Sequence, residues 1–251
     1  MSDAQRGKLI IIAGPSCAGK TPLKKALHRD YPDLAASLRE IVLHNDRPPR
    51  PEETDGEDYH FRRRDQIEAL RDNDRYLVTE VRGDLQALDL DDLHALLAKG
   101  DALYEGNPVF GKLLLTHEAL ADVPRLSVFV SPLSWDEVVY LREHQRVDER
   151  AVVTDVMRRR LLRRTRRQKG ELSRPDLEEV ERRADAVVAE LNTAHLYDHV
   201  IANHDGEDSE NWDGFGVPLA DARRALLALA ALLRGQSPEA TEHWPEPPFA
   251  V

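Results

Sequence analysis

The sequence has only one cysteine, Cys17, in 251 residues, so no disulfide can form within the chain. A chain without disulfides suits a reducing compartment, and we expect a cytoplasmic protein. Long apolar runs are also lacking. The apolar run at residues 8–13 is too short for a signal-peptide core and far too short to span a membrane, so we expect no membrane partner.

Excess positive charge is absent as well, because 46 acidic and 35 basic residues give a formal net charge of −11. Nucleic-acid polymers attract net-basic surfaces, so we expect no such polymer as a partner. A local basic cleft can still bind a nucleotide, since the field of a site is local. The ten histidines show no metal-ligand spacing such as H-E-x-x-H, and no structural metal is expected.

Predicted strands alternate with predicted helices along the chain. Residues 8–13 form a continuous β-branched run, which is typical of a buried parallel strand. Short apolar runs predict further strands at residues 76–81, 102–105, 126–130 and 197–202. Apolar periodicity and capping residues predict helices at residues 22–30, 64–73, 90–97, 135–143, 175–191 and 220–233. This alternation predicts an α/β fold with a parallel sheet flanked by helices.

The loop after the first predicted strand carries the most specific motif. Residues 14–21 read GPSCAGKT, which matches G-x-x-x-x-G-K-S/T in full, between a buried strand and a helix. Glycines let successive N–H groups point at phosphate oxygens, and the helix N-terminus adds a positive end. Lys20 is predicted to reach the β- and γ-phosphates and the Thr21 hydroxyl to ligate Mg²⁺. The predicted ATP-binding residues of this loop are Gly14, Pro15, Ser16, Cys17, Ala18, Gly19, Lys20 and Thr21.

A second anion-binding candidate follows at residues 46–61. Arg47 and Arg50 stand three residues apart in a proline-rich stretch, and arginine is preferred for bidentate phosphate recognition. Tyr59, nine residues after Arg50, adds a neutral hydroxyl donor. Read by itself, this segment is equally consistent with a charged surface loop.

Together these segments resemble the guanylate kinase family. That family has R-x-x-R-x-G-E-x-x-G-x-D-Y-x-F after its phosphate loop. Residues 128–134 resemble the family's strand and Pro-Ser turn, and residues 197–203 resemble its Y-D-x-V-I-x-N. The residues in register with the acceptor motif are Arg47, Arg50, Glu53, Gly56, Asp58, Tyr59 and Phe61. Pro51-Glu52 replaces a residue and a glycine of the motif.

The resemblance implies a P-loop kinase fold and a set of site residues. Arg47, Arg50 and Tyr59 are expected to hold the monophosphate of the acceptor. Glu105 is expected near the metal and the acceptor, and Asn203 near the adenine of ATP. These roles come from the resemblance, not from the spacing of the residues.

The base-reading positions depart from the family. The serine expected before the first arginine becomes Leu43, and the glutamate that accepts from two N–H groups of guanine falls at Leu77. Glu80, three residues later, is our candidate substitute. Residues 83–88 replace the G-N-Y-Y-G-T motif and carry neither tyrosine. We therefore expect retained phosphate binding and altered base binding.

Arginines are dense from residue 142 to residue 183. One interpretation is a solvated helix face with intrahelical ion pairs. The other is a lid, because phosphoryl transfer needs positive charge over the transferring group. Our candidates for lid arginines are Arg164, Arg167 and, by register with the family, Arg183.

These observations predict one domain over residues 1–251. Its predicted parts are a core at 7–42, 101–135 and 184–234, an acceptor-binding region at 43–100, a lid and insert at 136–183, and a loose tail at 235–251, where prolines are frequent. The leading hypothesis is an ATP- and Mg²⁺-dependent nucleoside monophosphate kinase acting on GMP, dGMP or a modified nucleotide. A kinase of a sugar phosphate and a non-catalytic binding module are the alternatives, and the intact GKT sequence disfavours the module. The sequence leaves the oligomeric state open.

Overall fold

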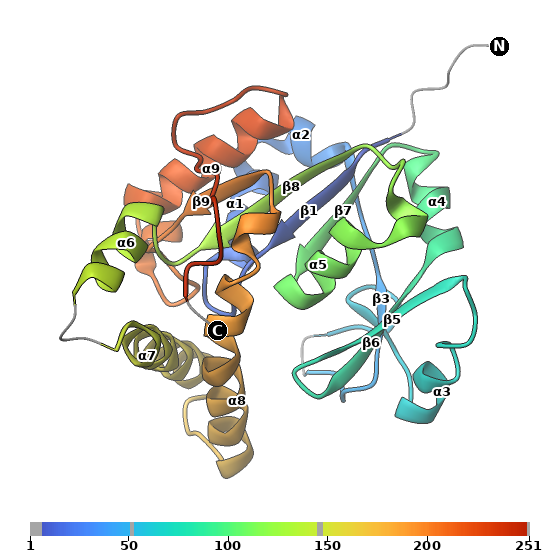
Figure 1. The fold of residues 1–251 in the computed structure, drawn as a ribbon, viewed down its shortest axis with the longest axis horizontal. Coiled ribbons are helices and arrows are strands. Elements are labelled where there is room, and N and C mark those ends of the chain that lie inside the picture. Colours follow the sequence, from blue (N-terminus) through green and yellow to red (C-terminus); the bar gives the residue numbers. More distant parts are fainter. Residues whose placement is uncertain (1–6, 51–52, 145–147, 250–251) are drawn as a thin grey trace. The chain divides into compact units, whose positions relative to one another are not determined.

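The computed structural model describes residues 7–50, 53–144 and 148–249 (Figure 1). The chain divides into two compact units. The first contains the chain up to Ile11 with residues 37–104 and 109–126, and the second contains residues 12–36, 105–108 and 127 onwards. The predicted acceptor-binding region at 43–100 falls within the first unit and the predicted lid within the second. The single domain stays a prediction.

A five-stranded sheet has the strand order β2-β7-β1-β8-β9. β2 pairs with β7, and β8 with β9, in parallel. All residues of β1 are buried, as a continuous β-branched run predicts for a strand covered on both faces. The α/β prediction, a parallel sheet flanked by helices, is confirmed. The strands are β1 (Leu9–Ala13), β2 (Leu38–Glu40), β7 (Asp101–Gly106), β8 (Arg125–Ser131) and β9 (His199–Ala202).

The first unit also contains a four-stranded sheet of order β4-β3-β6-β5. β3 runs parallel to β4, and β6 runs antiparallel to both of its neighbours. Strand β6 was not predicted, but Arg82 and Gly83 both have positive φ, which forms a two-residue hairpin turn and returns the chain along β5. These strands are β3 (Leu43–Asn45), β4 (Tyr59–Phe61), β5 (Tyr76–Val81) and β6 (Asp84–Asp89).

Short helices complete the first unit. The helix predicted at 64–73 is only α3 (Arg64–Glu68), because the chain turns after Ala69. Ile67 of α3 packs against Leu85 and Ala87 of β6 and closes one face of the four-stranded sheet. The other helices are α4 (Leu90–Leu97), α5 (Pro108–Thr116), which was not predicted, and the 3-10 turn η1 (Glu118–Leu120).

In the second unit, α7 and α8 lie side by side (Figure 1). α7 buries Val153, Met157 and Leu161, which are spaced four residues apart and form one apolar stripe along the helix. Among the described residues, no helix has the length and apolar character that crossing a bilayer requires. The helices of this unit are α1 (Lys20–Asp30), α2 (Pro32–Ala36), α6 (Trp135–Glu143), α7 (Glu149–Lys169), α8 (Arg174–Leu191) and α9 (Ala220–Leu233), with 3-10 turns η2 (Ala194–Leu196) and η3 (Glu210–Trp212).

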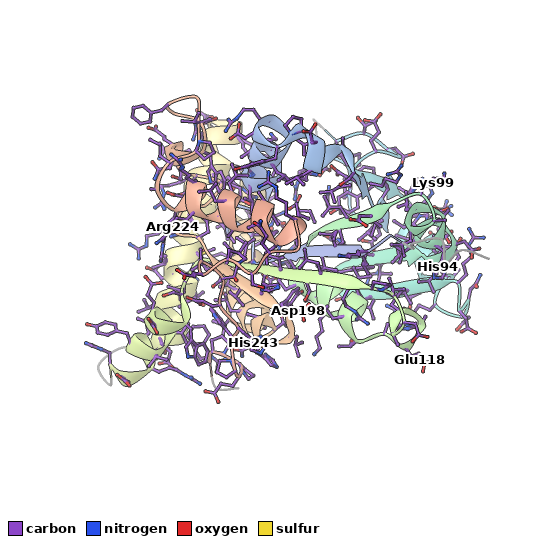
Figure 2. All side chains as sticks on the ribbon, turned by 90° about the horizontal axis from the view of Figure 1, so that it is seen from above. His94, Lys99, Glu118, Asp198, Arg224 and His243 are labelled. Atoms are coloured by element: carbon purple, nitrogen blue, oxygen red, sulfur yellow. The ribbon has the colours of Figure 1, made fainter. Side chains whose placement is uncertain are left out.

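The prediction of a loose tail at 235–251 is wrong for the described residues up to 249. Trp244 and Phe249 are fully buried, and Glu242 exchanges two backbone hydrogen bonds with Val200 of β9, at 2.7 and 2.8 Å. The Glu242 carboxylate also accepts a hydrogen bond of 2.9 Å from the backbone N–H of Trp135. Two large apolar side chains and the open edge of β9 therefore fix a segment whose prolines suggested disorder. His243, labelled in Figure 2, lies in this segment.

Candidate active site

The phosphate-binding loop lies in the second unit, between the end of β1 and the start of α1. Gly19 has φ +92°, and a Cβ there would lie 2.4 Å from the Asn203 Nδ2 and 2.6 Å from the Asp205 carbonyl. Cys17 also has a positive φ, of 65°. The chain therefore makes a tight curl that only glycine permits at position 19, as the motif predicted.

Lys20 lies within this curl. Its Nζ donates a hydrogen bond of 2.9 Å to the Pro15 carbonyl across the loop, and its side chain is buried. Thr21, in the first turn of α1, is exposed, so its hydroxyl is accessible. Glu105 at the end of β7 lies 3.9 Å from Lys24 Nζ in an ion pair. The oxygen donors Thr21 and Glu105 suit Mg²⁺, which prefers oxygen ligands and retains several waters.

Cys17 is fully buried in the loop. Burial raises the pKa of its thiol to about 12, and the nearby charge of Arg164 only partly opposes this effect. A thiol with so high a pKa is not a nucleophile at neutral pH. The side chain of Cys17 therefore fills space in the loop, and its backbone N–H is the group that can face a phosphate.

Asn203 is buried beneath the loop, and its predicted place near adenine stays a prediction. Its amide donates to the Ala18 carbonyl at 2.7 Å and to the Asp205 carbonyl at 2.8 Å, and its side chain is fully buried. Both amide hydrogens are thus used within the protein. This geometry gives Asn203 a role in positioning the loop.

The segment after β9 packs closely on the loop, which sequence reasoning missed. A Cβ at Gly206 would lie 2.4 Å from the Cys17 carbonyl, so the two backbones touch. Trp212 donates from Nε1 to the carbonyls of Asp205 and Gly206 at 2.9 and 3.1 Å and fixes the turn. A glycine and a tryptophan in an otherwise acidic loop were the available sequence signal.

Glu207 of this segment reaches the phosphate-binding loop directly. Its carboxylate accepts the Gly19 N–H at 3.1 Å. Backbone N–H groups of such loops are the donors that bind phosphate oxygens. The Glu207 carboxylate thus occupies a position suited to a phosphate oxygen, and the two anions compete for one donor.

Substitution of Glu207 by Gln should therefore strengthen ATP binding. A neutral side chain competes less well for the Gly19 N–H and does not repel the triphosphate, so we expect the Kd for ATP to fall by about threefold to tenfold. Titration calorimetry measures this change. Glu210→Gln, an exposed change in the same segment, is the matched control. An unchanged or higher Kd in the Glu207 variant would contradict this competition.

The predicted lid arginines occupy three different environments. Arg164 of α7 is close enough to the loop for its charge to act on Cys17, and its Nε is buried with no hydrogen-bond partner among the described residues. The Nη1 of Arg160, one turn earlier, is also buried and has no hydrogen-bond partner among the described residues. Arg167 is exposed, and Arg183 of α8 donates to Glu179 at 2.5 Å. Arg164 is therefore the lid candidate whose charge acts on the loop, and the roles of Arg167 and Arg183 stay predictions.

Other arginines of α7 form ion pairs, within the helix as predicted for Arg159 and with other segments for Arg158 and Arg163. Arg158 contacts Glu181 of α8 at 2.8 Å, and Arg159 contacts Asp155 at 2.9 Å. Arg163 pairs with Asp208 at 2.8 Å and so links α7 to the segment that contacts the loop. The interpretation as a solvated helix face therefore applies to these arginines, and the lid stays a prediction.

The predicted acceptor-binding residues come together in the first unit. Arg47 donates two hydrogen bonds of 2.6 Å to Glu53, and its guanidinium lies 5.0 Å from the ring centre of Tyr59 and 5.5 Å from that of Phe61. The Arg50 N–H donates to Glu53 at 2.8 Å. Burial opposes ionisation of Glu53, but these hydrogen bonds outweigh it and lower its pKa. Glu53 therefore holds the arginine fork in place, a role the sequence did not reveal.

Glu80 is not placed with these residues. It stands opposite Leu85 in the β5–β6 ladder, on the face that packs against α3. Its carboxylate accepts from Arg64 at 3.1 Å, and Arg64 also donates to Asp46 at 2.9 Å. Arg47 packs on Phe61 of β4. Phe61 stands beside Asn45 of β3, and Asn45 stands beside Gln86 of β6. These three residues lie on the face of the sheet opposite to Glu80.

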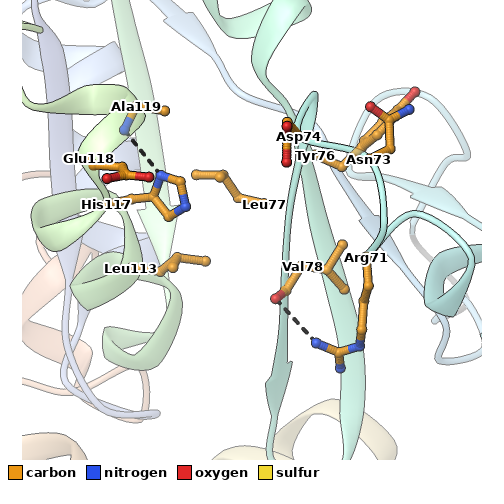
Figure 3. A pocket seen from close by; sticks show the side chains of 10 residues that line it. All are labelled: Arg71, Asn73, Asp74, Tyr76, Leu77, Val78, Leu113, His117, Glu118 and Ala119. Atoms are coloured by element: carbon orange, nitrogen blue, oxygen red, sulfur yellow. Dashed lines mark hydrogen bonds between the residues drawn. The ribbon is translucent and has the colours of Figure 1, made fainter.

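A separate pocket of about 800 Å³ lies in the first unit, between β5 and the segment from α5 to η1 (Figure 3). Leu77 faces Leu113 across it, and the His117 Nδ1 accepts from the Ala119 N–H at 3.3 Å. The described residues that line this pocket include none of the predicted site residues. We assign it no part in the site.

Comparisons with known proteins show which family the chain resembles. The model of the family described as "Guanylate kinase" matches residues 6–99. The guanylate kinase of Corynebacterium jeikeium is 30% identical over 81% of this chain and 92% of its own length. That of Alkalilimnicola ehrlichii is 32% identical over 92% of this chain and 94% of its own. The crystal structure of guanylate kinase from Anaplasma phagocytophilum shares the fold, with a TM-score of 0.53, 16% identity, and coverage of 94% of this chain and 89% of that one.

Proposed function

Because the chain belongs to the guanylate kinase family, we propose that it transfers the γ-phosphoryl group of ATP to GMP or dGMP. The chain is a nucleoside monophosphate kinase, which is a transferase. The proposal concerns the identity of its acceptor, a guanine nucleotide. The observation that carries the proposal is the complete phosphate loop with Lys20 inside it. The sugar-phosphate and non-catalytic alternatives have no support from these relatives.

Catalysis would consist mainly of positioning and of charge neutralisation. The loop N–H groups and Lys20 would hold the β- and γ-phosphates, with Asn203 and Gly206 supporting the loop from the protein side. Arg164, with its unpartnered Nε beside the loop, would neutralise charge that develops on the transferring group. Mg²⁺, bound through Thr21 with Glu105 nearby, would supply charge neutralisation of the triphosphate.

The acceptor phosphate would be held by Arg47, Arg50 and Tyr59. Arg47 presents the Nε side of a planar guanidinium that is held by Glu53 and stacked on aromatic rings, an arrangement that costs little further ordering on binding. The oxygen that attacks the γ-phosphoryl group belongs to the phosphate of the acceptor, so no hydroxyl group has to lose a proton. These residues therefore bind and orient the acceptor without acting on a proton.

A modified nucleotide is a second candidate for the acceptor. Leu43 and Leu77, which stand where the family resemblance implies a serine and a glutamate, are only 4% and 3% exposed. Neither can accept a hydrogen bond from the N–H groups of guanine. This observation favours an acceptor whose base differs from guanine.

A coupled assay of ADP formation with a panel of ribo- and deoxynucleoside monophosphates tests the proposal. We expect turnover with at least one of them and the highest kcat/KM with GMP or dGMP. High turnover with another nucleotide alone would replace guanine by that base. Absence of turnover with every nucleotide, while ATP still binds in a titration, would exclude the proposed function.

A further inference from the structure

One face of the four-stranded sheet carries a row of residues that spans all four strands. Phe61 of β4 stands opposite Asn45 of β3, Asn45 opposite Gln86 of β6, and Gln86 opposite Thr79 of β5. Residues directly opposite one another share a face. We call this row, with residues Phe61, Asn45, Gln86 and Thr79, the acceptor face, because Arg47 packs on Phe61 at its β4 end.

The other face of the sheet is already occupied. Leu85 and Ala87 of β6 pack there against Ile67 of α3. A molecule whose phosphate is held by Arg47 and Tyr59 can extend over this sheet only along the acceptor face. The side chains at the centre of that row are the carboxamides of Asn45 and Gln86, and the next positions on the same face, Leu77 and Leu88, are apolar and buried.

Asn45 has an unsatisfied donor on the acceptor face. Asn45 is 1% exposed. Its side-chain Oδ1 accepts a hydrogen bond of 3.1 Å from the backbone N–H of Arg47, which fixes the orientation of the amide. Its Nδ2 is buried with no hydrogen-bond partner within residues 7–50, 53–144 and 148–249. A buried N–H group without a partner destabilises a protein, so a structural role alone does not account for this amide.

We propose that Asn45 is a specificity-determining residue, whose Nδ2 donates a hydrogen bond to a carbonyl oxygen or ring nitrogen of the acceptor base. Gln86, directly opposite and 8% exposed, provides a second carboxamide to the same base edge. This inference rests on the proposed function, because it assumes a nucleoside monophosphate in the acceptor site. Base selection on this face then depends on neutral amide donors, which favour acceptor atoms on the base, and on apolar contact. A carboxylate at this place would favour N–H groups on the base instead.

Asn45→Asp separates base reading from the structural role. The substituted side chain has the same shape and keeps the oxygen that accepts the Arg47 N–H, but it replaces the Nδ2 donor by an acceptor. Asn73→Asp is the matched control, since the Asn73 Oδ1 accepts the Arg75 N–H two residues on, at 3.0 Å, in an exposed turn. Thermal melting of both variants reports whether the sheet still folds.

The experiment measures the Kd of each variant for a panel of nucleoside monophosphates by titration calorimetry, together with the Kd for ATP. For Asn45→Asp we expect the ratio of affinities between the preferred base and the others to change by about tenfold, with ATP affinity unchanged. The control should leave every ratio unchanged. Equal weakening of all monophosphates would reflect only added negative charge near Arg47 and would overturn the inference, as would unchanged ratios.

This readout also distinguishes the two proposals. Because it measures binding, a shifted ratio supports Asn45 as a base reader even if the coupled assay detects no turnover. Conversely, turnover with GMP combined with unchanged ratios in Asn45→Asp leaves the proposed function intact and refutes only the role of Asn45.

Discussion

Lys20→Ala is expected to lower kcat by about 10³-fold or more, because it removes the one side-chain cation of the loop that reaches the transferring phosphates. The Lys20 Nζ is held by the Pro15 carbonyl at 2.9 Å and is therefore oriented before ATP binds. Coupled measurement of ADP formation at saturating ATP and acceptor gives kcat directly.

The fold should survive this substitution. Lys20 is the first residue of α1, alanine has the highest helix propensity, and one lost hydrogen bond costs about 1 kcal/mol. Lys25→Ala, on the exposed side of the same helix, is the matched control and should keep full activity. A Lys20 variant that melts like the wild type and retains kcat within about tenfold would remove Lys20 from the mechanism.

Arg47→Ala is expected to raise the Kd for the acceptor monophosphate by about tenfold to a hundredfold and to leave the Kd for ATP within about twofold. Glu53 and the Pro48 carbonyl accept from three of the five N–H groups of Arg47, so within the described residues its Nε–H and second Nη2–H remain as two adjacent donors. Its stacking on Tyr59 and Phe61 keeps the guanidinium rigid. Arg47→Lys retains the charge without the fork and should recover only part of the affinity. Separate titrations with ATP and with the acceptor measure both constants.

Loss of stability must be separated from loss of binding in this experiment. Arg47 and Glu53 are each only 14% exposed, so removal of Arg47 leaves a largely buried carboxylate unpaired and destabilises the first unit. Arg63→Ala, an exposed arginine of the same unit, controls for a lost surface charge. Equal weakening of ATP and acceptor by Arg47→Ala, at a temperature where the variant is folded, would show that Arg47 does not bind the acceptor.

Much of the phosphate chemistry could be predicted from the sequence. The GPSCAGKT loop depends on local backbone conformation, and a short motif between a strand and a helix specifies it. Arg47, Arg50 and Tyr59 were predicted from the family resemblance, and the structure brings them together around Glu53. The apolar runs placed most strands because strand burial is also a local pattern.

The sequence alone determined the alternation of strands and helices that gives the parallel α/β fold, and the phosphate loop, since each depends on residues close together in the chain. The arginine pair was predicted only through the family resemblance. Only the tertiary structure decided that Glu207 reaches the Gly19 N–H, 188 residues away, and that Asn203 supports the loop from beneath. It also decided that Glu80 and Asn45 lie on opposite faces of the sheet and that Trp244 and Phe249 anchor the C-terminal segment. Such contacts depend on strand register and on burial between distant segments, which no local pattern encodes.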